Sequence, residues 1–193
     1  IEPLFAIQKQ GSWLTPLGES PIAADLADLI MKCCPLVADD ERAHLHVHSL
    51  EVELPFLQYF RKDVSLVPIC VSHMAAYADL ESVGRGVAEA IRSSGRPVLV
   101  VASTDMSHYV SQETAEKKDK AAIRRILDLD PKGLFDTVRT LGITMCGFQP
   151  TAAALVAAKS LGATGAHLVK YETSGSRTGD FSQVVGYAGI RIF

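Results

Sequence analysis

The sequence lacks the features that mark several large classes of protein. Its longest apolar runs, Pro97–Ala102 and Ala152–Ala158, are far shorter than the ~18 residues that a membrane-spanning helix needs, so we expect no membrane segment. Basic side chains are not in excess, because 19 Lys and Arg residues stand against 22 Asp and Glu residues, for a net charge of -3. Without a basic block, the chain is not expected to bind nucleic acid through its phosphates.

Cysteine is scarce as well, with four residues and no C-x-x-C pair. The adjacent Cys33 and Cys34 cannot easily close a relaxed disulfide. A chain without a disulfide framework fits a reducing compartment, so we expect a cytoplasmic location. Cys33, Cys34 and Cys70 lie among Leu, Ile, Met and Val, which favours a role as small buried hydrophobic residues.

What is present is the composition of a globular domain. The 193 residues are 48% hydrophobic and 21% charged, which suits one domain with its own core. Apolar strand-like segments alternate with segments of helical periodicity, and this alternation predicts a layered α/β fold. Helices are expected from Ser20-Pro21 onward, with Ser20 as the N-cap, and over residues 48–60, 78–92, 113–128, 131–140 and 151–161; strands are expected over residues 66–71, 97–103, 166–172 and 184–192.

The expected strand 97–103 is apolar on both faces, so we expect it to be buried, and a polar loop follows it. Loops of this kind form the binding crevice of layered α/β proteins. This loop carries Asp105 and, three residues later, His108. The pair could be a general acid and base, a metal ligand with the group that orients it, or a helix cap beside a surface histidine.

Cys146 lies in a turn-like segment, Thr-Met-Cys-Gly-Phe-Gln-Pro, just before an Ala-rich helix. The positive end of a helix dipole favours a thiolate at this position. A thiolate near an imidazole could act as a nucleophile, or the two groups could bind zinc, copper or iron. Sequence alone does not choose between these two chemistries.

Two other polar segments are candidates for binding. His44, His46 and His48 alternate along the chain, and an extended backbone would place their rings on one face, where they could bind a metal. The alternative is a solvated edge that is rich in histidine. Thr173–Asp180 is rich in glycine and hydroxyl groups, and could donate N–H groups to an anion or form a flexible hairpin tip.

Several segments share a recognisable pattern and order: Ser12-Trp-Leu-Thr-Pro-Leu-Gly18, His48-Ser-Leu-Glu-Val-Glu-Leu-Pro-Phe-Leu-Gln58, Ser103-Thr-Asp-Met-Ser-His108, Met145-Cys-Gly147 and Val185-Gly-Tyr187. Together they resemble the Memo-like family, which includes protein B of the AmmeMemoRadiSam system. The resemblance implies an αβα sandwich around a mostly buried mixed sheet. This fold is related to that of the class III extradiol dioxygenases, whose iron is held by two histidines and a carboxylate.

The resemblance also implies roles for individual residues. Cys146 and His108 are the expected ligands of an iron or copper ion, and His108, Asp105 and His48 are the expected catalytic residues. The family places two further histidine ligands in His-Ala-Gly and Gly-Pro-Ser-His-His segments, which would precede Ser12 and do not occur in this sequence. We therefore expect residues 1–193 to form a single Memo-like domain that lacks its N-terminal segment.

Three functions follow from this reading. The first is a metal-binding protein with redox activity, which would make it a metal-dependent oxidoreductase. The second is a dioxygenase or hydrolase that acts on a small substrate. The third is a non-enzymatic partner of a radical SAM protein, or a protein that binds a phosphotyrosine-type ligand in its pocket.

Overall fold

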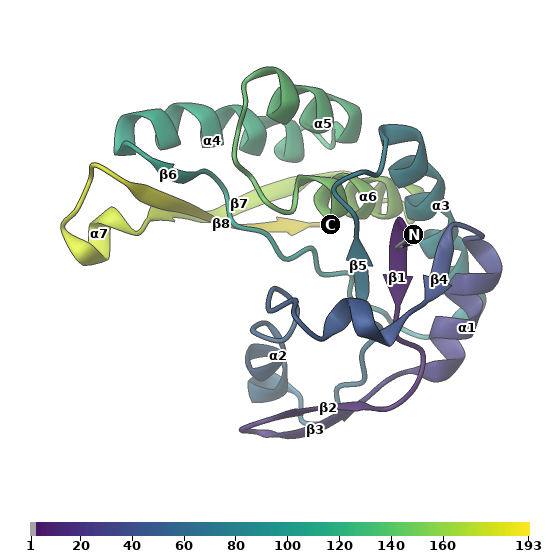
Figure 1. Cartoon of the computed structure of the whole chain (residues 1–193). Helices are drawn as coiled ribbons and strands as arrows, with labels where there is room; N and C mark the ends of the chain where they lie inside the picture. The colour runs from purple at the N-terminus through teal and green to yellow at the C-terminus, as the bar shows by residue number, and fades with distance from the viewer. Residues whose placement is uncertain (1–2) are drawn as a thin grey trace. The chain divides into compact units, whose positions relative to one another are not determined.

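A computed structural model describes residues 3–193 and gives the order of elements that Figure 1 shows. The chain divides into two compact units, Ile1–Leu99 and Val100–Phe193. Within the described residues, seven α-helices accompany three small sheets. The α/β class predicted from the sequence is therefore confirmed, and the mixture of elements is consistent with an α/β sandwich.

The first unit is built on a three-stranded mixed sheet. Its central strand β1 (Phe5–Ile7) runs parallel to β4 (Val37–Asp39) and antiparallel to β5 (Ile69–Val71). All three residues of β1 are buried, as expected for an apolar strand that is covered on both faces. A separate antiparallel hairpin pairs β2 (Ser12–Thr15) with β3 (Gly18–Pro21).

Two helices pack against each other in this unit. Helix α1 (Ala24–Cys33) contacts α3 (Tyr77–Ser94), and the buried residues of each helix recur at helical spacing. Gly86 of α3 lies against the end of α1, because an added Cβ there would be 2.4 Å from the Cys34 sulfur and 2.6 Å from the Cys33 carbonyl oxygen. The absence of a side chain at Gly86 allows α3 to pack against the end of α1.

The helix expected to begin at Ser20-Pro21 starts later, so this prediction is wrong at its first turn. Both residues belong to β3, and α1 begins at Ala24. The Ser20 hydroxyl is fully buried and accepts a hydrogen bond of 3.0 Å from Gln58 Nε2. It is committed to this tertiary contact and does not cap a helix.

The segment 48–60 is helical only in α2 (Leu54–Phe60). Pro55 falls in the first turn of this helix, where a proline is tolerated because the amide it lacks would have no partner in the helix. His48 therefore precedes the helix rather than entering it, which corrects the sequence-based boundary. Upstream lies the 3₁₀ helix η1 (Glu41–His44).

The second unit is built on an antiparallel sheet whose central strand is β8 (Val184–Ile192). It pairs with β6 (His108–Val110) on one side and with β7 (Ala166–Thr173) on the other. The strands expected over residues 166–172 and 184–192 are thus confirmed. Helix α4 (Gln112–Leu127) contacts all three strands and lies along the sheet (Figure 1).

The remaining helices of this unit complete its core. Helix α5 (Pro131–Thr140) contacts both α4 and α6 (Phe148–Ser160), and a single turn, α7 (Gly175–Thr178), lies between β7 and β8. The helices expected over 113–128, 131–140 and 151–161 are confirmed, with α6 beginning three residues earlier. The buried cluster between helices and sheet comprises Met106, Ala122, Ile123, Ile126, Leu129, Leu134, Val138, Ile143, Met145 and Leu155.

The buried strand expected over residues 97–103 does not form. No strand is assigned between residues 97 and 107, and the Leu99 side chain is 74% exposed. A strand needs a neighbour that satisfies its amide and carbonyl groups, and the structure assigns this segment no paired strand within residues 3–193. The apolar composition of the segment predicted that it is buried, but composition does not show whether a neighbouring strand is available to pair with it.

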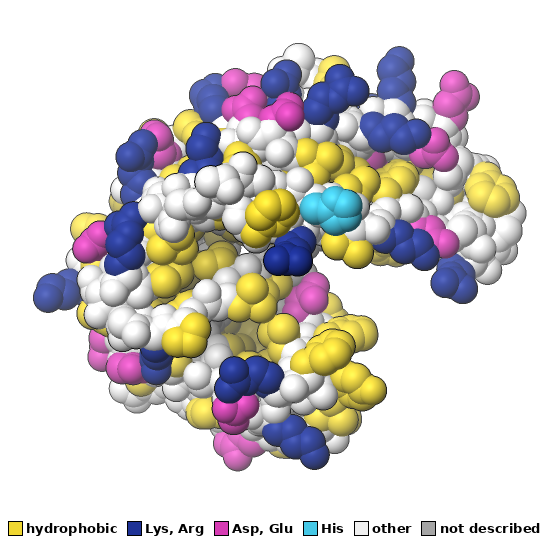
Figure 2. Space-filling view, turned by 180° about the vertical axis from the view of Figure 1, so that it is seen from behind, with side chains coloured by type: hydrophobic (Ala, Val, Ile, Leu, Met, Phe, Trp, Pro, Cys, Tyr) yellow, Lys and Arg dark blue, Asp and Glu magenta, His cyan; other side chains and the backbone are white. Residues whose placement is uncertain are grey.

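Charged side chains of both signs are interspersed on one face of the molecule. On the face that Figure 2 shows, Lys and Arg side chains are scattered and stand near Asp and Glu side chains. None of the helices in the described part of the chain is long and apolar enough to cross a membrane.

Candidate metal centre

His108 is held in a fixed orientation at the start of β6. Its Nδ1 lies 2.7 Å from the Thr144 carbonyl oxygen, and its backbone N–H donates to the Thr144 hydroxyl at 2.7 Å. A carbonyl oxygen only accepts, so Nδ1 carries the proton and Nε2 of a neutral ring keeps its lone pair. Contacts of this kind orient the histidine ligands of metal sites.

Asp105 and His108 face each other across the loop before β6. The Asp105 Oδ2 atom lies 3.5 Å from His108 Nε2. Both residues are partly buried. The sequence predicted that these two side chains would share a site, and the structure places them together.

Cys146 approaches Asp105 from a second loop, which precedes α6. The Asp105 N–H points at the Cys146 sulfur, with 3.4 Å between nitrogen and sulfur. The Thr104 hydroxyl oxygen lies 3.8 Å from the same sulfur. The next residue, Gly147, donates its N–H to the Thr104 hydroxyl at 2.8 Å. These contacts hold the two loops side by side, although the residues involved are about 40 positions apart along the chain.

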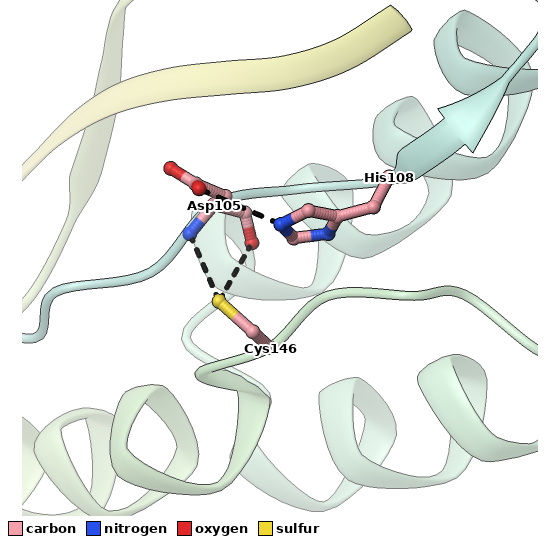
Figure 3. A group of neighbouring side chains, drawn as sticks. All are labelled: Asp105, His108 and Cys146. Carbon is pink, nitrogen blue, oxygen red and sulfur yellow. Dashed lines mark hydrogen bonds and ion pairs between the residues drawn. The ribbon is translucent and has the colours of Figure 1, made fainter. Parts of the chain in front are cut away.

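The three side chains converge at one place. One potential ligand atom each from Asp105, His108 and Cys146 lies within 4.8 Å of the other two. Figure 3 shows the imidazole directed at the Asp105 carboxylate, with the thiol directed at the backbone of the same residue. Over residues 3–193, this is the one group of three or more such side chains that could hold a metal ion.

The donor set fits a transition metal. Metal–ligand bonds of about 2.0–2.3 Å allow at most ~4.6 Å between two ligand atoms of one ion, so atoms that all lie within 4.8 Å of one another need only a small shift to share an ion. Thiolate and imidazole favour zinc, copper or iron, whereas calcium and magnesium favour sites built from oxygen atoms alone. Three protein ligands would leave a position for water or another small ligand.

His44, His46 and His48 do not form the shared face that an extended chain would give, so of the two interpretations that the sequence left open, the metal-binding face is wrong. His44 lies in η1 and its Nδ1 is 3.2 Å from the Cys70 sulfur, while His46 and His48 are exposed. The helical turn removes the alternation of sides that an extended backbone produces. His48 belongs to the first unit, where its Nδ1 lies 2.6 Å from Glu51 Oε1. Its catalytic role stays a prediction.

The other cysteines differ from Cys146 in their surroundings. Cys34 is buried, and Cys33 and Cys70 are partly buried. Burial raises the pKa of the Cys34 thiol to about 12 and that of the Cys70 thiol to about 11. The interpretation as buried hydrophobic residues thus fits Cys34 best. Cys70 contacts His44, which lies 26 residues upstream, and nothing in the sequence around Cys70 predicts this contact.

Alkylation should separate these thiols. We expect iodoacetamide at pH 8 to label exposed Cys146 readily and to leave Cys34 and Cys70 largely unmodified, because only about one Cys70 thiol in a thousand is ionised at that pH. Peptide mass spectrometry of a time course measures each site. Unfolded protein should label at all four cysteines at similar rates. Native labelling of Cys70 as fast as Cys146 would contradict the prediction.

Fold and site together define an α/β protein with a candidate transition-metal centre built from two neighbouring loops. A family model described as "Memo-like protein" matches residues 2–191. The chain belongs to the Memo-like family, which confirms the resemblance found in its sequence motifs.

Curated relatives agree with this assignment. A MEMO1 family protein of Methanothermobacter thermautotrophicus is 44% identical over 185 residues, which cover 96% of this chain and 66% of the relative. A MEMO1 family protein of Methanopyrus kandleri is 41% identical, with 96% of this chain and 65% of the relative covered. One from Pyrobaculum arsenaticum is 43% identical, with 96% and 66% covered. The chain spans about two thirds of the length of these relatives.

Proposed function

We propose that this protein binds an iron or copper ion through Asp105, His108 and Cys146 and supports redox chemistry there. The observation that carries the proposal is the convergence of three potential ligand atoms, from two different loops, within 4.8 Å. Iron or copper in such a site supplies one-electron redox chemistry and Lewis acidity.

Each residue has a distinct part in this proposal. His108 offers Nε2, because its Nδ1 is committed to the Thr144 carbonyl. Cys146 offers an exposed sulfur, which must lose its proton before it can bind a metal. Asp105 can serve as the third ligand, and without an ion its carboxylate can accept a hydrogen bond from a protonated His108 Nε2. Metal uptake should therefore release protons.

Nucleophilic catalysis by Cys146 is supported less well. A catalytic cysteine needs an imidazole within hydrogen-bond reach that takes its proton. Here Nδ1 of His108 faces the Thr144 carbonyl and Nε2 faces Asp105, while the sulfur is contacted by the Asp105 amide. The orientation of the His108 ring and of the Cys146 sulfur therefore favours three ligands around one metal ion. It does not favour a catalytic pair in which His108 takes the proton of Cys146.

The other functions remain secondary proposals. An extradiol-type oxygenase uses two histidines and one carboxylate, whereas this group has one histidine, one carboxylate and one thiol. Aerobic assays with ferrous iron and catechols test this alternative, since a ring-opened product would support it. A partnership with a radical SAM protein predicts a complex that persists when both His108 and Cys146 are replaced, and a pull-down with this pair of changes tests it.

The metal content of the Cys146→Ala variant tests the main proposal. We expect wild-type protein purified without chelators to carry iron or copper, and the variant to lose at least ~10-fold of its metal affinity, because a ligand is removed. Elemental analysis measures both metals. The Cys33→Ala variant is the matched control, since Cys33 lies in the other unit and its loss should leave the metal content unchanged. Equal metal in wild type and Cys146→Ala would overturn the proposal.

A further inference from the structure

Asp119 is a buried carboxylate that none of the proposed functions uses. It lies on α4 and is fully buried. Its Oδ1 accepts the Ser107 N–H at 2.9 Å, and its Oδ2 accepts the Tyr171 hydroxyl at 2.8 Å. A buried carboxylate is costly unless it is hydrogen-bonded, and both oxygens here have a neutral donor.

Ser107 lies between Asp105 and His108 in the sequence, in the loop that carries both potential ligands. Three successive amides of this loop are each bound by a different part of the unit. Met106 N–H donates to the Gly186 carbonyl of β8 at 2.9 Å, and His108 N–H donates to the Thr144 hydroxyl at 2.7 Å. The Ser107 N–H between them donates to Asp119. Of these three acceptors only Asp119 is a carboxyl side chain, and it reaches the loop from a helix.

Access of Asp119 to the loop depends on a glycine. A Cβ added at Gly186 would lie 2.1 Å from Asp119 Oδ2 and 3.1 Å from the Met106 Cβ. Gly186 also donates its N–H to the Ser107 carbonyl at 2.9 Å. The missing side chain at Gly186 thus lets a carboxylate from α4 lie against the strand and the loop at once.

We propose that Asp119 is the positioning residue of this metal site: by fixing the Ser107 amide, it sets the spacing of the Asp105 and His108 side chains. The inference rests on the proposed metal binding. Rotation of the peptide at Ser107 changes the direction of the chain on either side of it, where the two potential ligands stand. Asp119 acts through the loop and does not contact the ion.

A purely structural role is the alternative, because Asp119 also connects α4 to Tyr171 on β7. Two variants weaken the contacts between α4 and β7 without removing the hydrogen bond from Ser107 to Asp119. Tyr171→Phe removes one hydrogen bond of Asp119 and leaves its bond to Ser107 intact. Thr173→Val removes another contact between β7 and α4, the bond from the Thr173 hydroxyl to Gln112 Oε1. Both should lower the melting temperature without changing the metal site.

Cobalt(II) titration of the whole chain tests the proposal. Cobalt bound by a thiolate gives a charge-transfer absorption band, which reports coordination by Cys146, and its ligand-field bands report the geometry of the site. We expect Asp119→Ala to weaken cobalt binding roughly 10- to 100-fold and to shift these bands, as changes to groups that orient ligands do. Asp119→Asn, which keeps an acceptor for the Ser107 N–H, should restore most of the affinity.

The outcomes separate the two proposals. If Asp119→Ala does not fold, Asp119→Glu replaces it, because the longer side chain keeps the charge but displaces the Ser107 amide. Wild-type affinity and bands in whichever of these two variants is measured would overturn the positioning role and leave metal binding intact. Loss of the bands in Tyr171→Phe and Thr173→Val to the same extent would also overturn it. Absence of a thiolate band in wild-type protein would instead overturn metal binding, and the positioning role with it.

Discussion

Gly147→Ala is expected to abolish most metal binding and to lower the free energy of unfolding by about 1–3 kcal/mol, the usual cost of overpacking. An added Cβ at this position would lie 2.6 Å from the Thr104 Cβ and 2.7 Å from the Ser103 carbonyl oxygen. The φ angle of Gly147 is -104°, which any residue adopts, so the effect is steric. The methyl group should separate the loop of Cys146 from the loop of Asp105.

Gly189→Ala provides the control for this experiment. It adds the same methyl group to a strand of the same unit, where the nearest heavy atom, the Val169 Cβ, is 4.0 Å away. Chemical denaturation and metal titration of both variants measure the two effects. A Gly147→Ala variant that binds metal as wild type does would show that the loops can move apart without disturbing the site.

Met145→Ala is expected to destabilise the protein by about 2–5 kcal/mol, as removal of a large core side chain commonly does. Met145 is 2% exposed and belongs to the buried cluster of the second unit, as does Met106. The two methionines directly adjoin Cys146 and Asp105, so each loop of the site is anchored in the core by the neighbour of a ligand. A cavity at Met145 should therefore loosen the position of Cys146 as well.

Leu155→Ala separates these two effects. Leu155 is fully buried in the same cluster but lies inside α6, away from the ligand positions in the sequence. Both variants should show a similar loss of stability in urea, yet only Met145→Ala should bind metal more weakly at a temperature where both are folded. Equal metal affinities in the two variants would contradict the anchoring role of Met145.

Sequence patterns predicted the helices of this protein better than its strands. Periodic apolar positions placed α3, α4 and α5 to within a few residues, because a helix satisfies its own backbone and needs only one apolar face. Strands depend on partners that local sequence does not specify, and the segment 97–103 was predicted wrongly for this reason. The helix start predicted at Ser20-Pro21 was wrong because the Ser20 hydroxyl is hydrogen-bonded to the Gln58 side chain and does not cap a helix.

In the candidate site too, the sequence predicted the residues with a local signal and missed those whose role depends on contacts with distant parts of the chain. Asp105, His108 and Cys146 could be predicted because their residue types and motifs carry chemical meaning. Thr144, Gly147 and Asp119 were not, because their roles depend on distances to another loop. Thr144 and Gly147 do flank the Met145-Cys146 pair, so their proximity to a candidate ligand was a usable signal. For Asp119 the signal was a carboxylate at helical spacing with the apolar residues of its helix.

The exposed stretch from Pro97 to Val101 has a consequence for the behaviour of the chain in solution. Leu99, Val100 and Val101 are 74%, 38% and 44% exposed, and the structure assigns them to no sheet. Consecutive Leu and Val residues that are exposed to solvent favour pairing with the same segment of another molecule. At high protein concentration, intermolecular β-pairing through this stretch is the expected route to aggregation, and a charged residue placed at Leu99 is the simplest way to suppress it.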